Sequence, residues 1–204
     1  MSFMNQFARA LAPVAIVAAA APVQAQTSDL ARVEQHLSGV QSMTARFTQT
    51  DARNRVASGT VQLKRPGRIR FEYTGGDLLV VGNGRSLTMV DYQVGQKSSW
   101  DLNKTPLGIL LSANPDIKRI ARVVAQKDPR ILLVRARDSR RPEFGTLVLA
   151  FVRNPSAPGG LLLQGWTAID AQNKRTTVKL ESQRYNVAVP ESAFRYAEPK
   201  KRKG

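Results

Sequence analysis

Residues 57–73 read ASGTVQLKRPGRIRFEY and contain two segments, Ala57–Lys64 and Arg68–Tyr73, in which side-chain character alternates. The odd-numbered positions of both segments are apolar or small, and the even-numbered positions are polar. Because successive side chains of a strand point to opposite faces of a sheet, this period of two predicts two half-buried strands. One face of the sheet then packs into a core while the other faces water, which is typical of antiparallel sheets.

The same alternation occurs on both sides of this stretch. It predicts further strands at Met43–Thr48, Leu78–Val81, Ser86–Asp91, Arg130–Arg137, Thr146–Val152, Leu162–Asp170 and Arg175–Gln183. The sum is roughly ten antiparallel strands, and a sheet of that size curls to bury one face, as a sandwich or as an incomplete barrel capped by helices. The fold class predicted from the residues is therefore mainly β.

A helix is expected ahead of the strands. Apolar residues from Leu30 to Leu37 recur at helical spacing and predict an amphipathic helix over Asp29–Ser38. His36, the only histidine, falls on the opposite face of this helix. Since no partner set accompanies it, we interpret His36 as a solvated residue rather than as a ligand or a base.

Two more short helices are expected in the middle of the chain. Thr105-Pro106 combines an N-cap with proline at the first helical position, and the leucines that follow share one face. Asn114-Pro115-Asp116 predicts the start of a second helix, whose apolar side runs on to Val124. These helices interrupt the run of strands.

The amino terminus is typical of a secretory signal. Arg9 precedes the apolar run Ala10–Ala21, and Val23 and Ala25 stand at positions −3 and −1 of a cleavage site. The apolar run is too short to span a bilayer, which needs about 20 residues. We therefore expect residues 1–25 to be removed, residues 26–198 to form one folded domain, and residues 199–204 to be a basic, disordered tail.

Composition excludes several classes of function. The formal net charge of +16 is compatible with nucleic acid, anionic lipid or an acidic protein as partner, and export argues against nucleic acid. The chain has no cysteine and one histidine, and no cluster has the spacing of metal ligands, so no metal, cofactor or catalysis is expected. A curled sheet with a helical cover instead indicates a container for something apolar.

Four segments in a fixed order resemble a known family. They are ARFTQT (45–50), GTVQLKRPGRIRFEY (59–73), GNGRSL (82–87) and TPLGILL (105–111). Together they span residues 45–111 of the expected mature chain, and they resemble the periplasmic outer-membrane lipoprotein carrier (LolA) family. The resemblance implies an incomplete antiparallel β-barrel lidded by short helices, with an apolar cavity that holds acyl chains. Some members of the family continue beyond a last strand that corresponds to Phe194–Tyr196, whereas this chain ends in the basic tail.

The resemblance also implies a location and partners. Members of the family work in the periplasm as monomers, receive acylated lipoproteins from an ATP-driven extractor in the inner membrane, and deliver them to the outer membrane. Delivery goes through an outer-membrane receptor or directly to that membrane. The resemblance assigns Arg65, in the LKRP segment, to a latch that holds lid-helix carbonyls.

Other residues are implied as parts of the container. Leu107, Leu110 and Leu111 form the inner face of the lid helix. The candidates for the walls of the acyl cavity are Phe47, Leu63, Ile69, Phe71, Leu87, Met89, Trp100 and Trp166.

Two alternatives stay open at this point. The first is a carrier or sensor of the same fold that binds another lipid or amphipathic ligand. The second is a periplasmic hydrolase, against which the scarcity of histidine and the absence of cysteine argue.

Overall fold

The computed structural model describes residues 23–111 and 117–200, and in them eleven strands form a single antiparallel sheet. The strands are β1 (Ser42–Thr50), β2 (Val56–Lys64), β3 (Arg68–Tyr73), β4 (Leu78–Asn83), β5 (Ser86–Asp91), β6 (Gln96–Asp101), β7 (Ala121–Val124), β8 (Ile131–Ala136), β9 (Thr146–Arg153), β10 (Leu161–Ile169) and β11 (Arg175–Tyr185). Helices and short 3-10 helices (η) connect and flank them. They are α1 (Val23–Gly39), α2 (Pro106–Leu111), α3 (Ile117–Ile120), η1 (Leu102–Lys104), η2 (Pro142–Phe144), η3 (Pro158–Gly160) and η4 (Glu191–Phe194).

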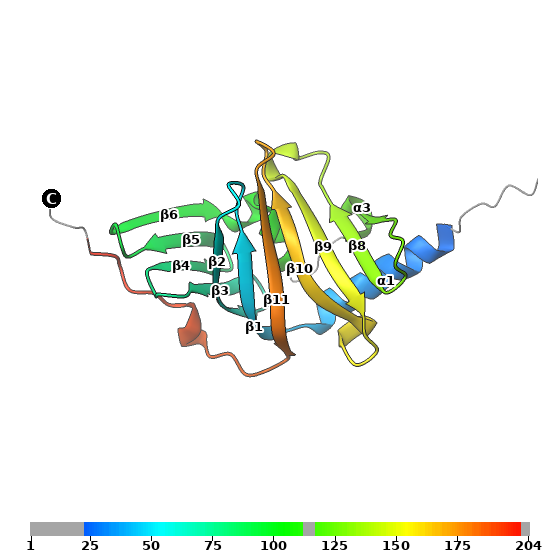
Figure 1. Ribbon diagram of the computed structural model, residues 1–204, viewed down its shortest axis with the longest axis horizontal. Coiled ribbons are helices and arrows are strands. Elements are labelled where there is room, and N and C mark those ends of the chain that lie inside the picture. The colour runs from blue at the N-terminus through cyan, green and yellow to red at the C-terminus, as the bar shows by residue number, and fades with distance from the viewer. Residues whose placement is uncertain (1–22, 112–116, 201–204) are drawn as a thin grey trace, which may run out of the picture.

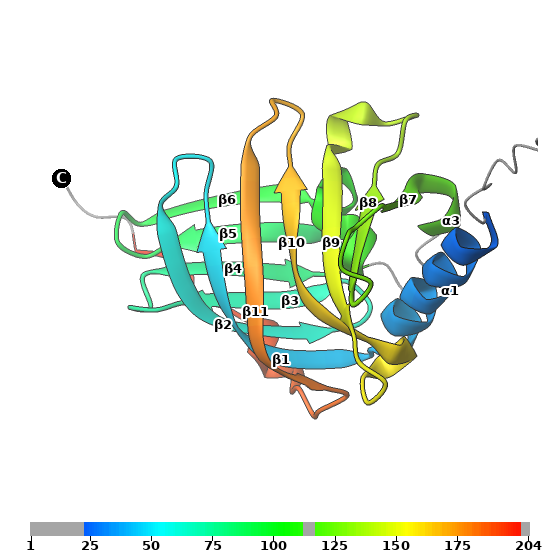
Figure 2. The same ribbon diagram turned by 45° about the vertical axis from the view of Figure 1, so that its right-hand side comes forward.

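The sheet is strongly curled and remains open. Its strand order is β6-β5-β4-β3-β2-β1-β11-β10-β9-β8-β7, so β6 and β7 are its two edges and do not pair with each other. Figure 1 and Figure 2 show the strands wrapping around an interior, with α1 along one side. The mainly β, incomplete barrel predicted from the sequence is confirmed.

Strand connectivity divides the sheet into two halves. Each strand of β1–β6 pairs with the next one along the chain, and the same holds for β7–β11. The halves are joined by one ladder between β1 and β11, in which Met43 lies opposite Tyr185. The first and last strands of the chain therefore meet in the middle of the sheet.

The core lies on the concave face of the sheet, under the helices. One continuous apolar cluster contains alternate residues of the strands together with residues of α1, α2 and α3. Phe71 of β3 and Trp166 of β10 form a T-shaped pair with ring centroids 6.1 Å apart. These two strands are four places apart in the sheet, so the pair spans the interior and shows how tightly the sheet curls.

Two strands were not predicted, for different physical reasons. All six side chains of β6 are exposed, so no apolar face marks it in the sequence. β7 follows α3 without a break, and the apolar side that we assigned to a helix up to Val124 belongs from Ala121 onward to a strand. The start predicted for that helix at Asn114-Pro115-Asp116 lies outside the described residues.

The prediction for His36 is wrong. Its side chain is only 2% exposed, because η3 packs on the side of α1 that local periodicity assigned to solvent. The helix itself is longer than predicted and begins at Val23, so it crosses the expected cleavage position. The rest of the proposed signal peptide, residues 1–22, lies outside the described residues.

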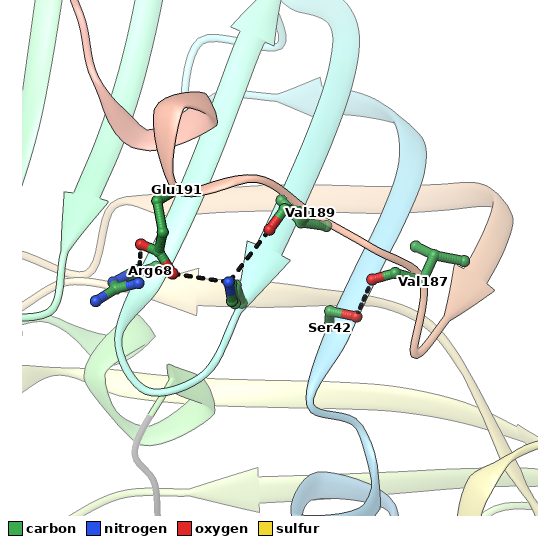
Figure 3. Close-up of polar contacts among 6 residues, drawn as sticks. Ser42, Arg68, Val187, Val189 and Glu191 are labelled. Atoms are coloured by element: carbon green, nitrogen blue, oxygen red, sulfur yellow. Dashed lines mark hydrogen bonds and ion pairs between the residues drawn. The ribbon is translucent and has the colours of Figure 1, made fainter.

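The C-terminal segment, residues 186–198, forms a strap across the convex face of β1–β6. Phe194–Tyr196, expected as a strand, is instead the end of η4 and an extended stretch after it. Val189 and Phe194 pack on outward-facing apolar residues of β4 and β5. The Lys64 ammonium donates to the Val189 carbonyl and to one oxygen of the Glu191 carboxylate. Arg68 donates to the other oxygen of Glu191 (Figure 3).

Candidate functional site

The concave apolar face is the candidate site, and it contains the residues that the sequence pointed to. Strand register places Phe47 of β1, Leu63 of β2, and Ile69 and Phe71 of β3 on this face, together with Trp166 of β10. All five side chains are buried. Aromatic pairs connect part of this face, since the Phe47 ring lies 5.1 Å from the rings of both Phe71 and Tyr73.

Helix α2 lies inside the curl of the sheet. Thr105, just before it, donates its hydroxyl to the Leu102 carbonyl, and the helix starts at Pro106 as the sequence predicted. Leu110 and Leu111 are fully buried in the core and Leu107 packs against it. The helix contacts β9 and β10, so its apolar face occupies space that a ligand of the interior would need.

The apolar face continues beyond the helices toward the β6 edge. Leu87 and Met89 of β5 lie on the concave side and are only half-buried, and Trp100 of β6 lies directly opposite Leu87. Trp100 is 48% exposed. The core of the molecule is therefore continuous with an uncovered apolar margin, where water reaches an indole ring.

The turn between β2 and β3 connects this sheet to the ends of two helices. The Arg65 side chain donates from Nε to the carbonyl of Val40, one residue past α1, at 2.9 Å. Two residues later, the backbone N–H of Gly67 donates to the carbonyl of Leu111, the last residue of α2, at 3.0 Å. The turn thus satisfies carbonyls that would otherwise lack partners at helix ends.

Gly67 was missed in the sequence, although a glycine beside a proline in a turn is a usable signal. Its φ is +69°, and a Cβ at this position would lie 2.5 Å from the Cα of Gly84. Both the left-handed backbone and the close approach exclude larger residues. Gly67 therefore fixes the position from which its N–H reaches α2.

Burial changes the ionisation of two residues near the helix ends. Desolvation lowers the pKa of Arg65 to about 10. Burial also lowers the pKa of His36 below its ordinary value of 6.5, against the opposing effect of backbone hydrogen bonds to Pro158 and Leu161. His36 Nδ1 lies 2.9 Å from the Pro158 carbonyl oxygen, and its ring sits between Phe151 and Tyr185 in edge-on contacts.

Within 23–111 and 117–200, no three His, Asp or Glu side chains gather in a group that could hold a metal ion. Over the same ranges, none of the helices is both long and apolar enough to cross a membrane.

Comparison with known proteins agrees with the fold. The family model described as "Outer membrane lipoprotein carrier protein LolA" matches residues 38–197. A protein of Chromobacterium violaceum named outer-membrane lipoprotein carrier protein is 28% identical over 195 residues, which cover 91% of each chain. A protein of the same name from Pseudomonas entomophila is 26% identical and covers 94% of this chain and 95% of its own.

Among solved structures, an uncharacterised conserved protein from Thermus thermophilus superposes with a TM-score of 0.50 at 13% identity. The match covers 86% of this chain and 96% of the other, and it extends the likeness to the whole fold.

Proposed function

The chain belongs to the LolA family of outer-membrane lipoprotein carrier proteins, and from this premise we propose that it carries lipoproteins through the periplasm from the inner to the outer membrane. Its acyl-binding site is the concave apolar face, and it acts by binding, without catalysis. The donor is an ATP-driven extractor in the inner membrane. The acceptor is a receptor on the outer membrane or that membrane itself.

One observation supports this proposal above the others: the apolar interior is continuous with the uncovered margin at Leu87, Met89 and Trp100. An ordinary core is sealed by polar residues at its rim. Here the half-buried Leu87 packs directly against the core, so an acyl chain at the margin meets apolar surface that adjoins the interior. The margin therefore serves as the entrance for acyl chains.

The described state is closed and packed, which sets an energetic requirement for loading. Leu110 and Leu111 of α2 and the aromatic residues of the sheet fill the interior. Each acyl CH₂ withdrawn from a bilayer forgoes about 0.8 kcal/mol, so one long chain costs on the order of ten kcal/mol. When α2 is displaced, contacts with the apolar interior offset most of the free energy that the acyl chain loses on leaving the bilayer. The ATP-driven donor supplies the rest.

Arg65 and Gly67 act as the latch of the closed state. The described bond of the Arg65 side chain goes to the end of α1, and the bond to the lid helix comes from Gly67. Both bonds leave the same turn, so movement of α2 strains the turn that also holds α1. We infer that cargo binding breaks this pair of contacts and that their re-formation helps to expel cargo.

Export and the cleaved leader belong to the same proposal. Residues 1–25 direct secretion and are removed, although helical structure starts at Val23 in the uncleaved chain. The mature protein then works in the periplasm as a monomer.

Native mass spectrometry of carrier purified from the periplasm tests the function. The expected result is a population whose added mass equals a triacylated lipoprotein, together with empty carrier. A matched variant, Trp100→Ser, should carry less cargo because the entrance loses its largest apolar side chain. Free phospholipid as the sole bound mass would contradict the proposal and support a carrier or sensor of another lipid.

A further inference from the structure

The convex face of the sheet is covered on one half only. The strap of residues 186–198 covers the β1–β6 half. On β8, β9 and β10 the side chains opposite to the core-facing ones remain uncovered by the described residues. These outward apolar side chains are Ile131, Leu133, Val148, Ala150, Val152 and Leu162, of which Ile131 is 38% exposed and the others are half-buried.

Two adjoining hollows lie on this face and share Val148. The first, of about 460 Å³, is lined mainly by apolar groups of β8–β11, among them Leu133 and Ala150. It lies at Gly165, where a bulge shifts the register of β9 and β10. A Cβ at Gly165 would lie 2.0 Å from the Val178 carbonyl oxygen, so only glycine fits there.

The second hollow, of about 750 Å³, is polar and basic. Arg135 of β8, Arg137 just after β8 and Arg175 of β11 line it, together with Thr146 and Asn173. None of the three guanidinium groups has a hydrogen-bond or ion-pair partner in the part of the chain that the structure describes. Other arginines of the described chain are paired with carboxylates, as in Arg130 with Asp128 and Arg153 with Asp29.

Two carboxylates also line the basic hollow and limit its positive charge. Asp170 is already engaged, since one of its oxygens accepts backbone N–H groups of Gln172 at 2.9 Å and Lys174 at 2.8 Å. Glu143 offsets one cation. Three unpaired guanidinium groups against these two acids leave a site with surplus donors and surplus positive charge.

We propose that the two hollows together bind one anionic amphiphile that carries a phosphate ester. The planar fork of arginine matches phosphate oxygens in pairs, and three such forks line this one hollow. The adjoining hollow removes the apolar part of the same molecule from water. Free phosphate would leave the apolar hollow unused, and a zwitterionic head group would bring a cation toward the arginines. The site lies on the face of the sheet opposite to the proposed cargo site.

The probe is a short-chain phosphatidylglycerol, used below its critical micelle concentration and titrated into ¹⁵N-labelled mature protein. Amide signals of Gly145 and Asn173 report on the convex site, and the Trp100 indole signal reports on the concave one. The double variant Arg135→Gln/Arg175→Gln should bind the probe at least about tenfold more weakly at Gly145 and Asn173, because two charge-assisted contacts are lost. The matched control Arg53→Gln/Arg184→Gln removes the same charge from exposed arginines outside both hollows and should bind as the wild type does.

Two further ligands distinguish the contribution of the head group to binding from that of the acyl chains. Glycerol phosphate should bind the same amides more weakly than phosphatidylglycerol, and short-chain phosphatidylcholine should bind more weakly still. Equal binding of glycerol phosphate and phosphatidylglycerol would contradict the proposal that the ligand is an amphiphile, and it would indicate a site for phosphate alone. Equal binding of phosphatidylcholine, or equal weakening in the control variant, would overturn the role of the guanidinium groups. Chemical-shift changes confined to the Trp100 indole signal would contradict binding at the convex site and would leave the proposed cargo site unaffected.

Discussion

Among single residues, Arg65 has the most specific role in the proposed function. If its contacts exist only in the closed state, replacing it should favour the loaded state by linkage. A charge-assisted bond is worth about 1.5–3 kcal/mol, which corresponds to a shift of about tenfold or more in the loaded fraction. We expect Arg65→Leu to accept lipoprotein and release it poorly, and Arg65→Lys to be intermediate, because an ammonium lacks the fork.

The measurement is the fraction of carrier that co-purifies with lipoprotein. Arg53→Leu, at an exposed position, is the control for loss of charge. A folded Arg65→Leu protein that holds no more cargo than wild type would show that Arg65 only ties the β2–β3 turn to the end of α1.

His36 predicts how stability depends on pH. Unfolded chains bind the proton with the ordinary pKa of 6.5, whereas burial lowers the pKa in the folded state. The unfolded state therefore binds more protons below pH 6.5, and the free energy of unfolding falls there by at most about 1.4 kcal/mol per pH unit. Above that pH the residue has little effect.

Thermal unfolding between about pH 5 and pH 7.5 checks this prediction above the range in which most carboxylates titrate. His36→Gln cannot titrate and should show a flatter dependence of Tm on pH than wild type. Parallel profiles for the two proteins would mean that His36 takes up its proton without loss of packing.

The wrong prediction for His36 also shows what local sequence can predict. The spacing from Leu30 to Leu37 located the helix and its apolar stripe, and both exist. The burial of His36 depends on η3, more than a hundred residues away, where Gly159 lets the chain approach the helix backbone. The periodicity of the sequence around His36 cannot reveal a contact with so distant a segment.

At the scale of elements, the strap is expected to stabilise the β4–β5 half of the sheet. Phe194 is buried against Leu79, Val81 and Val90. Replacing a buried Phe by Ala costs about 3–5 kcal/mol in well-packed cores, and we expect the lower end of that range for Phe194→Ala at this edge of the fold. Denaturant unfolding, with the exposed Ser192→Ala as control, measures the loss. Equal stability of the two variants would show that the strap rests on the sheet without supporting it.

Strands with one buried face and one exposed face could be predicted from the sequence, and strands without this contrast could not. Most strands between β1 and β11 bury one face and show the period of two. β6 buries neither face, and β7 is only four residues long and directly follows a helix. Neither strand therefore has a sequence pattern from which it could be predicted. For the candidate site, alternation identified buried positions such as Ile69, but only register showed that Trp100 shares their face at an uncovered edge.

At the scale of the whole molecule, the positive charge of the C-terminal tail and the place where the tail leaves the fold predict binding to anionic membranes. Lys97 of β6 holds Glu198 at 2.6 Å, so the chain leaves the fold at the strand that carries Trp100. The chain therefore reaches Lys200, where the basic tail begins, near the β6 edge of the sheet, and Lys97 lies on the convex face whereas Trp100 lies on the concave face. Cations near an anionic surface contribute about 1 kcal/mol each and fade within a Debye length.

We expect deletion of Lys200–Gly204 to weaken binding to anionic vesicles at low salt and to leave the fold intact. Co-sedimentation with vesicles and circular dichroism measure the two effects. A variant of the same length, with Lys200–Lys203 replaced by serine, separates charge from chain length. Equal sedimentation of all three proteins would identify the tail as a solvated end.

The single ladder between β1 and β11 has a consequence for how the protein folds. Every other ladder joins strands that are neighbours along the chain, so each of these ladders closes a short loop and can form before the β1–β11 ladder. The β1–β11 ladder closes a loop that contains almost the whole domain, and its loop-closure entropy makes it a late step. When the exported chain enters the periplasm from its N-terminus, the first six strands emerge well before β11, and the apolar side of their meander still lacks the opposite wall. The emerging chain therefore passes through a half-formed container, and this stage has the greatest need of a holding chaperone.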